Sequence, residues 1–164
     1  MNEKELLTKK FMLVDMGDAK ISTDEKPIIG TQALATCLGV LLYSEEKKIA
    51  IVAHVPPDEI QALMTINKIF ELIVDHKLIS ITFKYKIIKG YYEEHYHIFE
   101  LLEKHFSHFI PFNNNEIPDY AIQTDEKYTS KKFAFNSLTG KFVTNNVFFG
   151  TDYNIINNIN KKAK

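Results

Sequence analysis

The sequence predicts an α+β fold in which layered β-sheets are flanked by helices. Many short segments are apolar, or alternate between apolar and polar residues, as strands do. Two longer segments repeat apolar residues every three or four positions, as helices do. The strands and helices do not alternate regularly, which argues against a doubly wound sheet. The 164 residues, 45% hydrophobic and 25% charged, fit one globular domain spanning residues 1–164.

The predicted strands are, in chain order, residues 11–14, 19–22, 38–43, 49–54, 79–87, 121–124, 132–136 and 141–145. Gly17 and Asp18 supply the turn between the first two. The charged run 44–48 is expected to be the tip of a hairpin formed by the next two. Residues 79–87 alternate strictly and form the clearest strand pattern. Gly140 supplies the turn between the last two strands. The polar stretch 30–36 is expected to be a loop that enters the hairpin.

Two helices are expected. Residues 56–59, Pro-Pro-Asp-Glu, suit the first turn of a helix that ends near His76. The second helix is expected at 93–106, and the segment 113–118 that follows it is a predicted loop. The tail at 153–164, rich in Asn, Ile and Lys, is expected to fray. The predicted apolar positions are Ile60, Leu63, Met64, Ile66, Phe70, Ile73 and Val74 in the first helix, and Ile98, Leu101, Leu102 and Phe106 in the second.

Charge and cysteine content narrow the class of protein. The net charge of −1 provides no basic field for nucleic acid, so no nucleic-acid partner is expected. A single cysteine excludes an internal disulfide and favours a reducing compartment. The first ten residues lack the apolar core of a secretory signal, and no apolar run is long enough to span a bilayer. We therefore expect a cytoplasmic protein, although export by another route would leave no mark in the sequence.

The only cysteine, Cys37, begins the first strand of the predicted hairpin, and His54 ends the second. Antiparallel strands of similar length place these two residues at the same end of the sheet. An imidazole there can hold the thiol as a thiolate and later protonate a leaving amine. Thr31 could orient the imidazole, and the backbone amides of Thr36 and Cys37 could form an oxyanion hole. The alternative is a cysteine that only fills the core.

These residues resemble a motif set of the bacterial chemoreceptor glutamine deamidases, the CheD family. That family has the pattern GMGD.K.S, then T.GLGSC, then an apolar strand ending in LYD, and a second strand ending in H..LP. This chain has DMGDAKIS, TQALATC, GVLLYS and VAHVPP in the same order. The spacings from Thr31 to Cys37 and from Cys37 to His54 match, and the resemblance covers about residues 12–57. The Cys-to-His spacing also resembles that of protein N-terminal asparagine amidohydrolases.

The resemblance implies a CheD-like fold and a cysteine-dependent deamidase that hydrolyses a side-chain carboxamide of a protein through a thioester. Cys37 would be the nucleophile, His54 the general acid and base, and Thr31 the orienting group. Neither a cofactor nor a metal is required, and glutamine is favoured over asparagine. Ala33 and Ala35 stand where the CheD pattern has glycines, and alanine adopts positive φ less readily than glycine.

Three alternatives stay open: an N-terminal asparagine amidase, a deamidase exported to act on a foreign protein, and a catalytically inert relative that binds a partner. An acidic pocket for a free α-amino group would favour the amidase, and a long groove would favour an internal glutamine. A buried Cys37 out of reach of His54 would favour the inert relative. The remaining histidine cluster lacks the spacing of a known zinc site, so no metal is expected there: His95, His97, His105 and His108.

Overall fold

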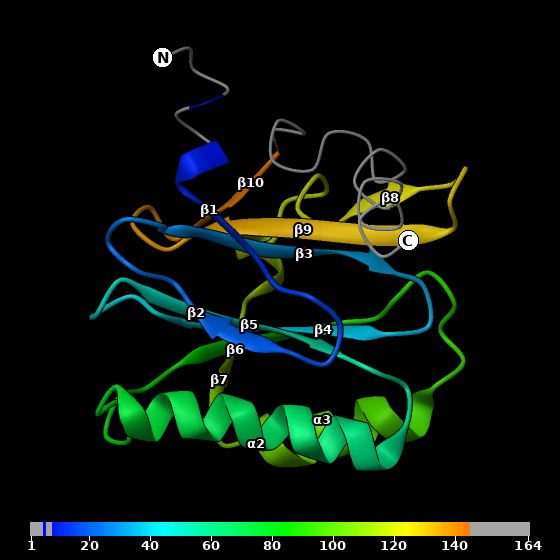
Figure 1. The fold of residues 1–164 in the computed structure, drawn as a ribbon, viewed down its shortest axis with the longest axis horizontal. Helices are drawn as coiled ribbons and strands as arrows, with labels where there is room; N and C mark the ends of the chain where they lie inside the picture. The colour runs from blue at the N-terminus through cyan, green and yellow to red at the C-terminus, as the bar shows by residue number, and fades with distance from the viewer. Residues whose placement is uncertain (1–4, 6–7, 145–164) are drawn as a thin grey trace, which may run out of the picture.

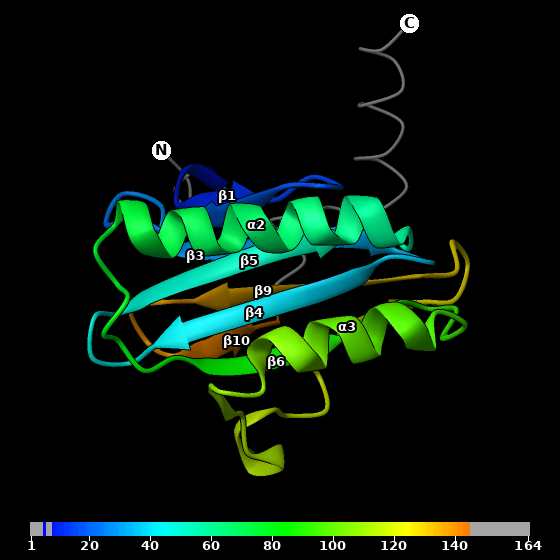
Figure 2. The ribbon, with the colours of Figure 1, turned by 90° about the horizontal axis from the view of Figure 1, so that it is seen from below.

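The computed structural model describes residue 5 and residues 8–144, which form an α+β fold of two sheets and a helical layer (Figure 1). Sheet A has the order β1 (Phe11–Leu13), β3 (Ile28–Leu34), β9 (Ser130–Asn136) and β10 (Lys141–Val143), and β8 (Gln123–Asp125) also pairs with β9. Sheet B has the order β2 (Ala19–Ile21), β5 (Ile49–Val55), β4 (Leu38–Ser44), β6 (Lys84–Ile88) and β7 (Ile110–Pro111). Helices α2 (Glu59–Asp75) and α3 (Tyr96–Phe106) lie on the same side of sheet B (Figure 2), and the short 3-10 helix η1 (Asn114–Glu116) follows β7.

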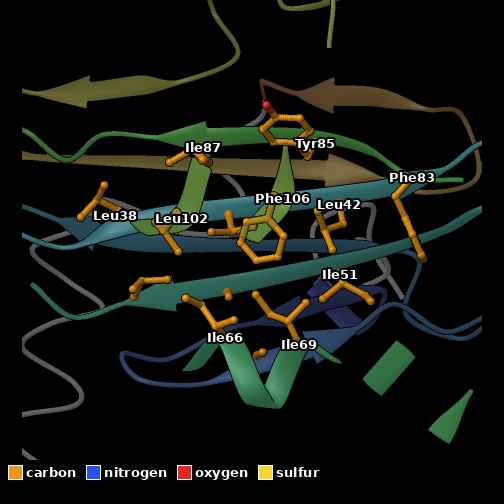
Figure 3. Close-up of a cluster of buried hydrophobic side chains, with 14 of the residues drawn as sticks. Leu38, Leu42, Ile51, Ile66, Ile69, Phe83, Tyr85, Ile87, Leu102 and Phe106 are labelled. Carbon is orange, nitrogen blue, oxygen red and sulfur yellow. The ribbon is translucent and has the colours of Figure 1, made fainter. Parts of the chain in front are cut away.

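Two hydrophobic cores separate the three layers. The helix-side core lies between sheet B and the helices, and Figure 3 shows Ile66 and Ile69 of α2 and Phe106 of α3 among its members. The inter-sheet core lies between sheets A and B and includes Cys37 and Phe133. Strands β4 and β5 are therefore covered on both faces, which explains why their sequences are continuously apolar.

The predicted hairpin is confirmed. Strands β4 and β5 pair antiparallel, with Gly39 opposite His54 and Leu38 opposite Val55. The exposed charged residues between the two strands form its tip. The strands predicted near residues 11, 19, 123, 132 and 141 are also present, with ends shifted by a few residues. Asn145, the last residue predicted for the final strand, and the tail 153–164 lie outside the described residues.

The loop predicted at 30–36 is wrong, because residues 28–34 form β3. This strand pairs with β1 on one side and β9 on the other, so Thr31 and Gln32 are buried despite being polar. Its pairing partners are distant in sequence, and the local polarity therefore misled the prediction. The strand predicted at 79–87 is wrong in its first half. A turn closed by the bond from Ile81 N–H to the Leu78 carbonyl precedes β6.

The apolar face predicted for the first helix is partly wrong. The buried positions of α2 are Ala62, Thr65, Ile66, Ile69 and Ile73. Small side chains at positions 62 and 65 allow close approach to the sheet, and a search for large apolar residues overlooks them. The exposed members of the predicted face are Ile60, Leu63, Met64 and Val74. The second helix begins at Tyr96, later than predicted. Among the described residues, none of the helices is both long and apolar enough to cross a bilayer.

Candidate active site

Thr31 and His54 meet across the inter-sheet core. Thr31 lies on β3 of sheet A, and His54 lies near the end of β5 of sheet B. Thr31 Oγ1 is 2.8 Å from His54 Nδ1, and both side chains are buried, with exposed fractions of 0% and 4%. The contact expected between these two residues is therefore present, but it is made by a strand instead of a loop.

The second hydrogen bond of Thr31 fixes the protons in this contact. The Thr31 hydroxyl donates to the Val14 carbonyl oxygen at 2.7 Å, and a carbonyl can only accept. Because the hydroxyl has one proton, Oγ1 must accept from His54, so Nδ1 carries hydrogen. In the neutral ring the lone pair is then on Nε2, which is the atom that can act as a base.

The imidazole of His54 is neutral near pH 7. Burial lowers the pKa of His54 from 6.5 to about 4, because water no longer solvates the charged ring. The Nε2 atom is buried and makes no hydrogen bond to any described residue. The ring is thus held by one nitrogen while the other presents an unused lone pair.

Cys37 lies just before β4 and belongs to the inter-sheet core. It is two residues before Gly39, the cross-strand partner of His54, so it is a diagonal neighbour of His54 on one face of sheet B. The structure has no hydrogen bond between the thiol and His54 Nε2. Cys37 is 5% exposed, and burial raises the pKa of its thiol. The resting pair is therefore a neutral thiol and a neutral imidazole, and the expected thiolate is not favoured in this state.

Phe133 lies against Gly39, the cross-strand partner of His54. It is the cross-strand partner of Thr31 in sheet A, so both side chains point toward sheet B. A Cβ built on Gly39 would be 2.8 Å from Phe133 Cε1, so the ring occupies the position that a side chain at residue 39 would fill. The sequence analysis missed Phe133, because only the pairing of β3 with β9 brings it to the site.

The loop that precedes the thiol, residues 33–37, is here called the Cys37 loop. Ala33 has a φ of 58°, a left-handed conformation that costs a residue with a Cβ about 1 kcal/mol or more. The CheD pattern has glycine at this position. The backbone N–H groups of Thr36 and Cys37 donate to no acceptor among the described residues, so both amides are available for an oxyanion.

A neighbouring segment holds the Cys37 loop in place. The N–H groups of Tyr91 and Tyr92 donate to the carbonyls of Leu34 and Ala35, both at 2.9 Å. The α-carbon of Gly90 lies against the carbonyls of Ala35 and Cys37 so closely that no Cβ would fit. The sequence marked Gly90 only as the end of a strand, so this contact could not be found from the local pattern.

Of the other histidines, His95 borders a small pocket that Thr36 and Gly90 also line. His95 and His97 have ring centroids 6.1 Å apart in and just before α3. Within the part of the chain that the structure describes, no three His, Cys, Asp or Glu side chains are grouped as metal ligands would be. No known protein-family model and no curated protein matches this chain, so the resemblance to CheD rests on the motif residues themselves.

Proposed function

We propose that the protein is a CheD-like cysteine deamidase that hydrolyses a side-chain carboxamide of a protein, with glutamine favoured over asparagine. One observation carries the proposal: the chain of bonds from His54 through Thr31 to the Val14 carbonyl. It leaves His54 Nε2 as an unpartnered base on the face of the sheet that carries the only thiol. The motif resemblance gives Thr31, Cys37 and His54 the matching roles.

The reaction would begin from the neutral pair. As Cys37 Sγ attacks the carboxamide carbon, His54 Nε2 takes the thiol proton, and the new oxyanion accepts from the amides of Thr36 and Cys37. The positive charge that forms on His54 is stabilised through Nδ1–H and Thr31. Substrate binding must bring Sγ within hydrogen-bond reach of Nε2, about 3 Å, because the resting structure has no such bond.

The next steps return the site to its starting state. Nε2–H gives its proton to the nitrogen as the C–N bond breaks, which releases ammonia and leaves a thioester on Cys37. Water then attacks the thioester while His54 takes its proton, and the C–S bond breaks as the proton returns to sulfur. The product is a carboxylate. A reducing compartment such as the cytoplasm would keep Cys37 in the thiol form that this chemistry needs.

The proposal is tested by ammonia release from an unfolded, glutamine-rich protein such as casein, with mass spectrometry to find the converted side chains. We expect Cys37→Ala and His54→Ala to abolish the release. Thr31→Val should lower its rate by about 10²-fold or more, the usual range for general acid–base catalysis. Thr31→Ser keeps the hydroxyl and should retain most of the rate. Release that persists in Cys37→Ala would contradict the proposal.

One observation favours the inert relative as a second candidate. Cys37 is buried and makes no hydrogen bond to His54 in the resting structure. Iodoacetamide carries the carboxamide of a deamidase substrate, whereas iodoacetate carries a carboxylate. A deamidase should react faster with iodoacetamide, after correction for the rates of the same reagents with glutathione. Equal corrected rates, together with no ammonia release, would support the inert relative.

A further inference from the structure

We propose that this protein binds its substrate as an added β-strand along the open edge of β6, and that Lys86 there selects a segment with a carboxylate near the target glutamine. The fate of the bound segment rests on the proposed deamidase function, but the binding itself does not. Three features carry the proposal: a groove, an unpaired strand edge, and a cation without an acidic partner.

A groove of about 600 Å³ follows β6, a size typical of ligand sites. All five residues at 85–89 line it. Side chains of a strand alternate between two faces, so a cavity that all five border must lie along the edge of the strand. Phe112, Ile122, Lys131 and Phe99 of α3 border the same space. Figure 2 shows β6 on the far side of β4 from β5, next to α3.

The backbone of this edge is unpaired beyond Tyr85. Strand β7 pairs only with Lys84 and Tyr85, and the last bond on this side runs from Phe112 N–H to the Tyr85 carbonyl. Residues two apart in a strand direct their backbone N–H and C=O groups to the same side. The Tyr85 groups face β7, so the N–H and C=O of Ile87, beyond the end of β7, face the groove. Neither group of Ile87 bonds to a described residue on that side. Such an edge accepts an extended peptide by main-chain hydrogen bonds.

Lysines outnumber acids along the groove, with Lys86, Lys89 and Lys131 against Glu93 and Glu103, so its net charge favours an acidic segment. Lys131 pairs with Glu93 at 3.6 Å, and Lys89 lies over the rings of Tyr96 and Phe99. Lys86 forms no ion pair with any acid among the described residues. It is the cross-strand partner of Leu41, a member of the inter-sheet core, so its side chain points to the face that also carries Cys37.

The strand that borders the groove also lies beside the proposed active site. Ile88 pairs with Gly39, and Gly90 lies against the carbonyls of the Cys37 loop. A strand added to β6 lies two strand spacings from β4, about 10 Å. Glutamine extends one methylene group farther from the backbone than asparagine, so of the two carboxamides it comes closer to the Cys37 loop. A groove open along a strand edge, lined by cations as well as acids, suits an internal segment better than a free N-terminus.

The test uses a peptide with the order Glu-Val-Thr-Val-Gln-Val-Thr-Val-Glu, labelled with fluorescein. Each Glu lies four residues from the central Gln, and Lys86 lies four residues from Gly90. A peptide with its Gln beside Gly90 therefore places one Glu beside Lys86 in either strand direction. Binding is measured by fluorescence anisotropy with the Cys37→Ala protein, because this variant lacks the proposed nucleophile and cannot convert the glutamine of the peptide during the measurement. Two further peptides carry backbone N-methyl groups, one on the valines and the other on Thr and Gln. Alternate residues of an extended strand direct their N–H groups to opposite sides, so only one of these two sets of N–H groups can bond to β6.

We expect one N-methylated peptide to lose binding by about tenfold or more and the other to bind like the parent. Lys86→Glu should weaken the parent peptide by a similar factor and should favour a peptide with Lys in place of Glu. Lys47→Glu, the same charge change at the exposed hairpin tip, is the matched control and should have no effect. The proposal is overturned if the parent does not bind at up to about 1 mM. Equal binding of both methylated peptides, or indifference to Lys86→Glu, would also overturn it.

Ammonia release from the same peptides by the wild-type protein separates the two proposals. Binding of the expected pattern without ammonia release would leave the groove proposal standing and contradict the deamidase. Ammonia release at equal rates from the parent peptide and both methylated peptides, with Lys86→Glu as active as the wild type, would support the deamidase and contradict the groove.

Discussion

The buried, neutral His54 should make the fold lose stability in acid. The pKa of His54 is about 4 in the folded chain and 6.5 when exposed. Above pH 6.5 the residue is neutral in both states, and its contribution to stability is complete. As the pH falls from 6.5 to 4, the unfolded chain binds a proton that the folded chain does not, so unfolding is favoured. Below pH 4 both states are protonated, and the loss is complete.

The size of this loss follows from the difference between the two pKa values. Each pKa unit corresponds to about 1.4 kcal/mol, so the whole difference amounts to about 3 kcal/mol. Between pH 7.5 and pH 4.5 most of it, about 2–3 kcal/mol, should be lost. A typical domain is stable by only about 5–15 kcal/mol, so the effect is large enough to measure by urea unfolding.

Carboxylates also titrate in this range, so the effect of His54 is isolated by comparison with His54→Asn. The amide of Asn can donate to Thr31 as Nδ1 does, but it does not titrate. The free energy of unfolding, followed by circular dichroism at both pH values, should fall by about 2–3 kcal/mol more in the wild type than in the variant. His97→Asn, an exposed position in α3, is the matched control and should behave like the wild type. Equal losses in the wild type and His54→Asn would refute the assignment of a buried neutral imidazole.

Three further predictions concern the same site. The iodoacetamide reaction of Cys37 should follow a thiol pKa above the ordinary value of about 8.5, because burial raises that pKa, and His54→Asn should not change it; a thiol pKa well below 8.5 would indicate a resting ion pair and contradict the neutral mechanism. Thr31→Val leaves the buried Nδ1–H unpaired and should cost about 1–3 kcal/mol in urea unfolding. Thr31→Val should destabilise less when made together with His54→Phe, and an equal loss in that double variant would mean that the Thr31 hydroxyl stabilises the fold through a group other than His54. Ala33→Gly relieves the positive φ and should raise the free energy of unfolding by about 0.5–1 kcal/mol, whereas the control Ala35→Gly should lower it; destabilisation by both would show that Ala33 is not strained.

The sequence predicted the parts of the site that depend on neighbouring segments. The hairpin brings Cys37 and His54 to one end of the sheet through its own short connection. Two apolar runs separated by a charged run are the sequence pattern of a hairpin, so this connection was predicted. The amphipathic spacing likewise predicted both helices. These elements are specified by residues close to each other in the chain.

The parts that the sequence analysis missed depend on distant pairing. Strand β3 has polar residues at positions 31 and 32, and it is a strand because β1 and β9 pair on either side of it. Phe133 reaches the site only through that pairing. The edge of β6 is open because β7 ends beside Tyr85, and the sequence of β6 itself does not predict where its neighbour ends. Single-sequence periodicity reports which face is apolar, but it does not report which strand lies beside which.

If the protein is the proposed deamidase, the burial of Cys37 and His54 requires that substrate binding move part of the chain. With exposed fractions of 5% and 4%, neither group is open to a carboxamide in the resting state. The Cys37 loop is the best candidate for the moving part, because it holds the positive φ of Ala33, and Tyr91 and Tyr92 bind its carbonyls through two backbone hydrogen bonds. Those two residues directly follow Gly90, at the end of the proposed groove. A strand added to β6 would therefore act on the segment that holds the loop, so binding and exposure of the thiol would be coupled.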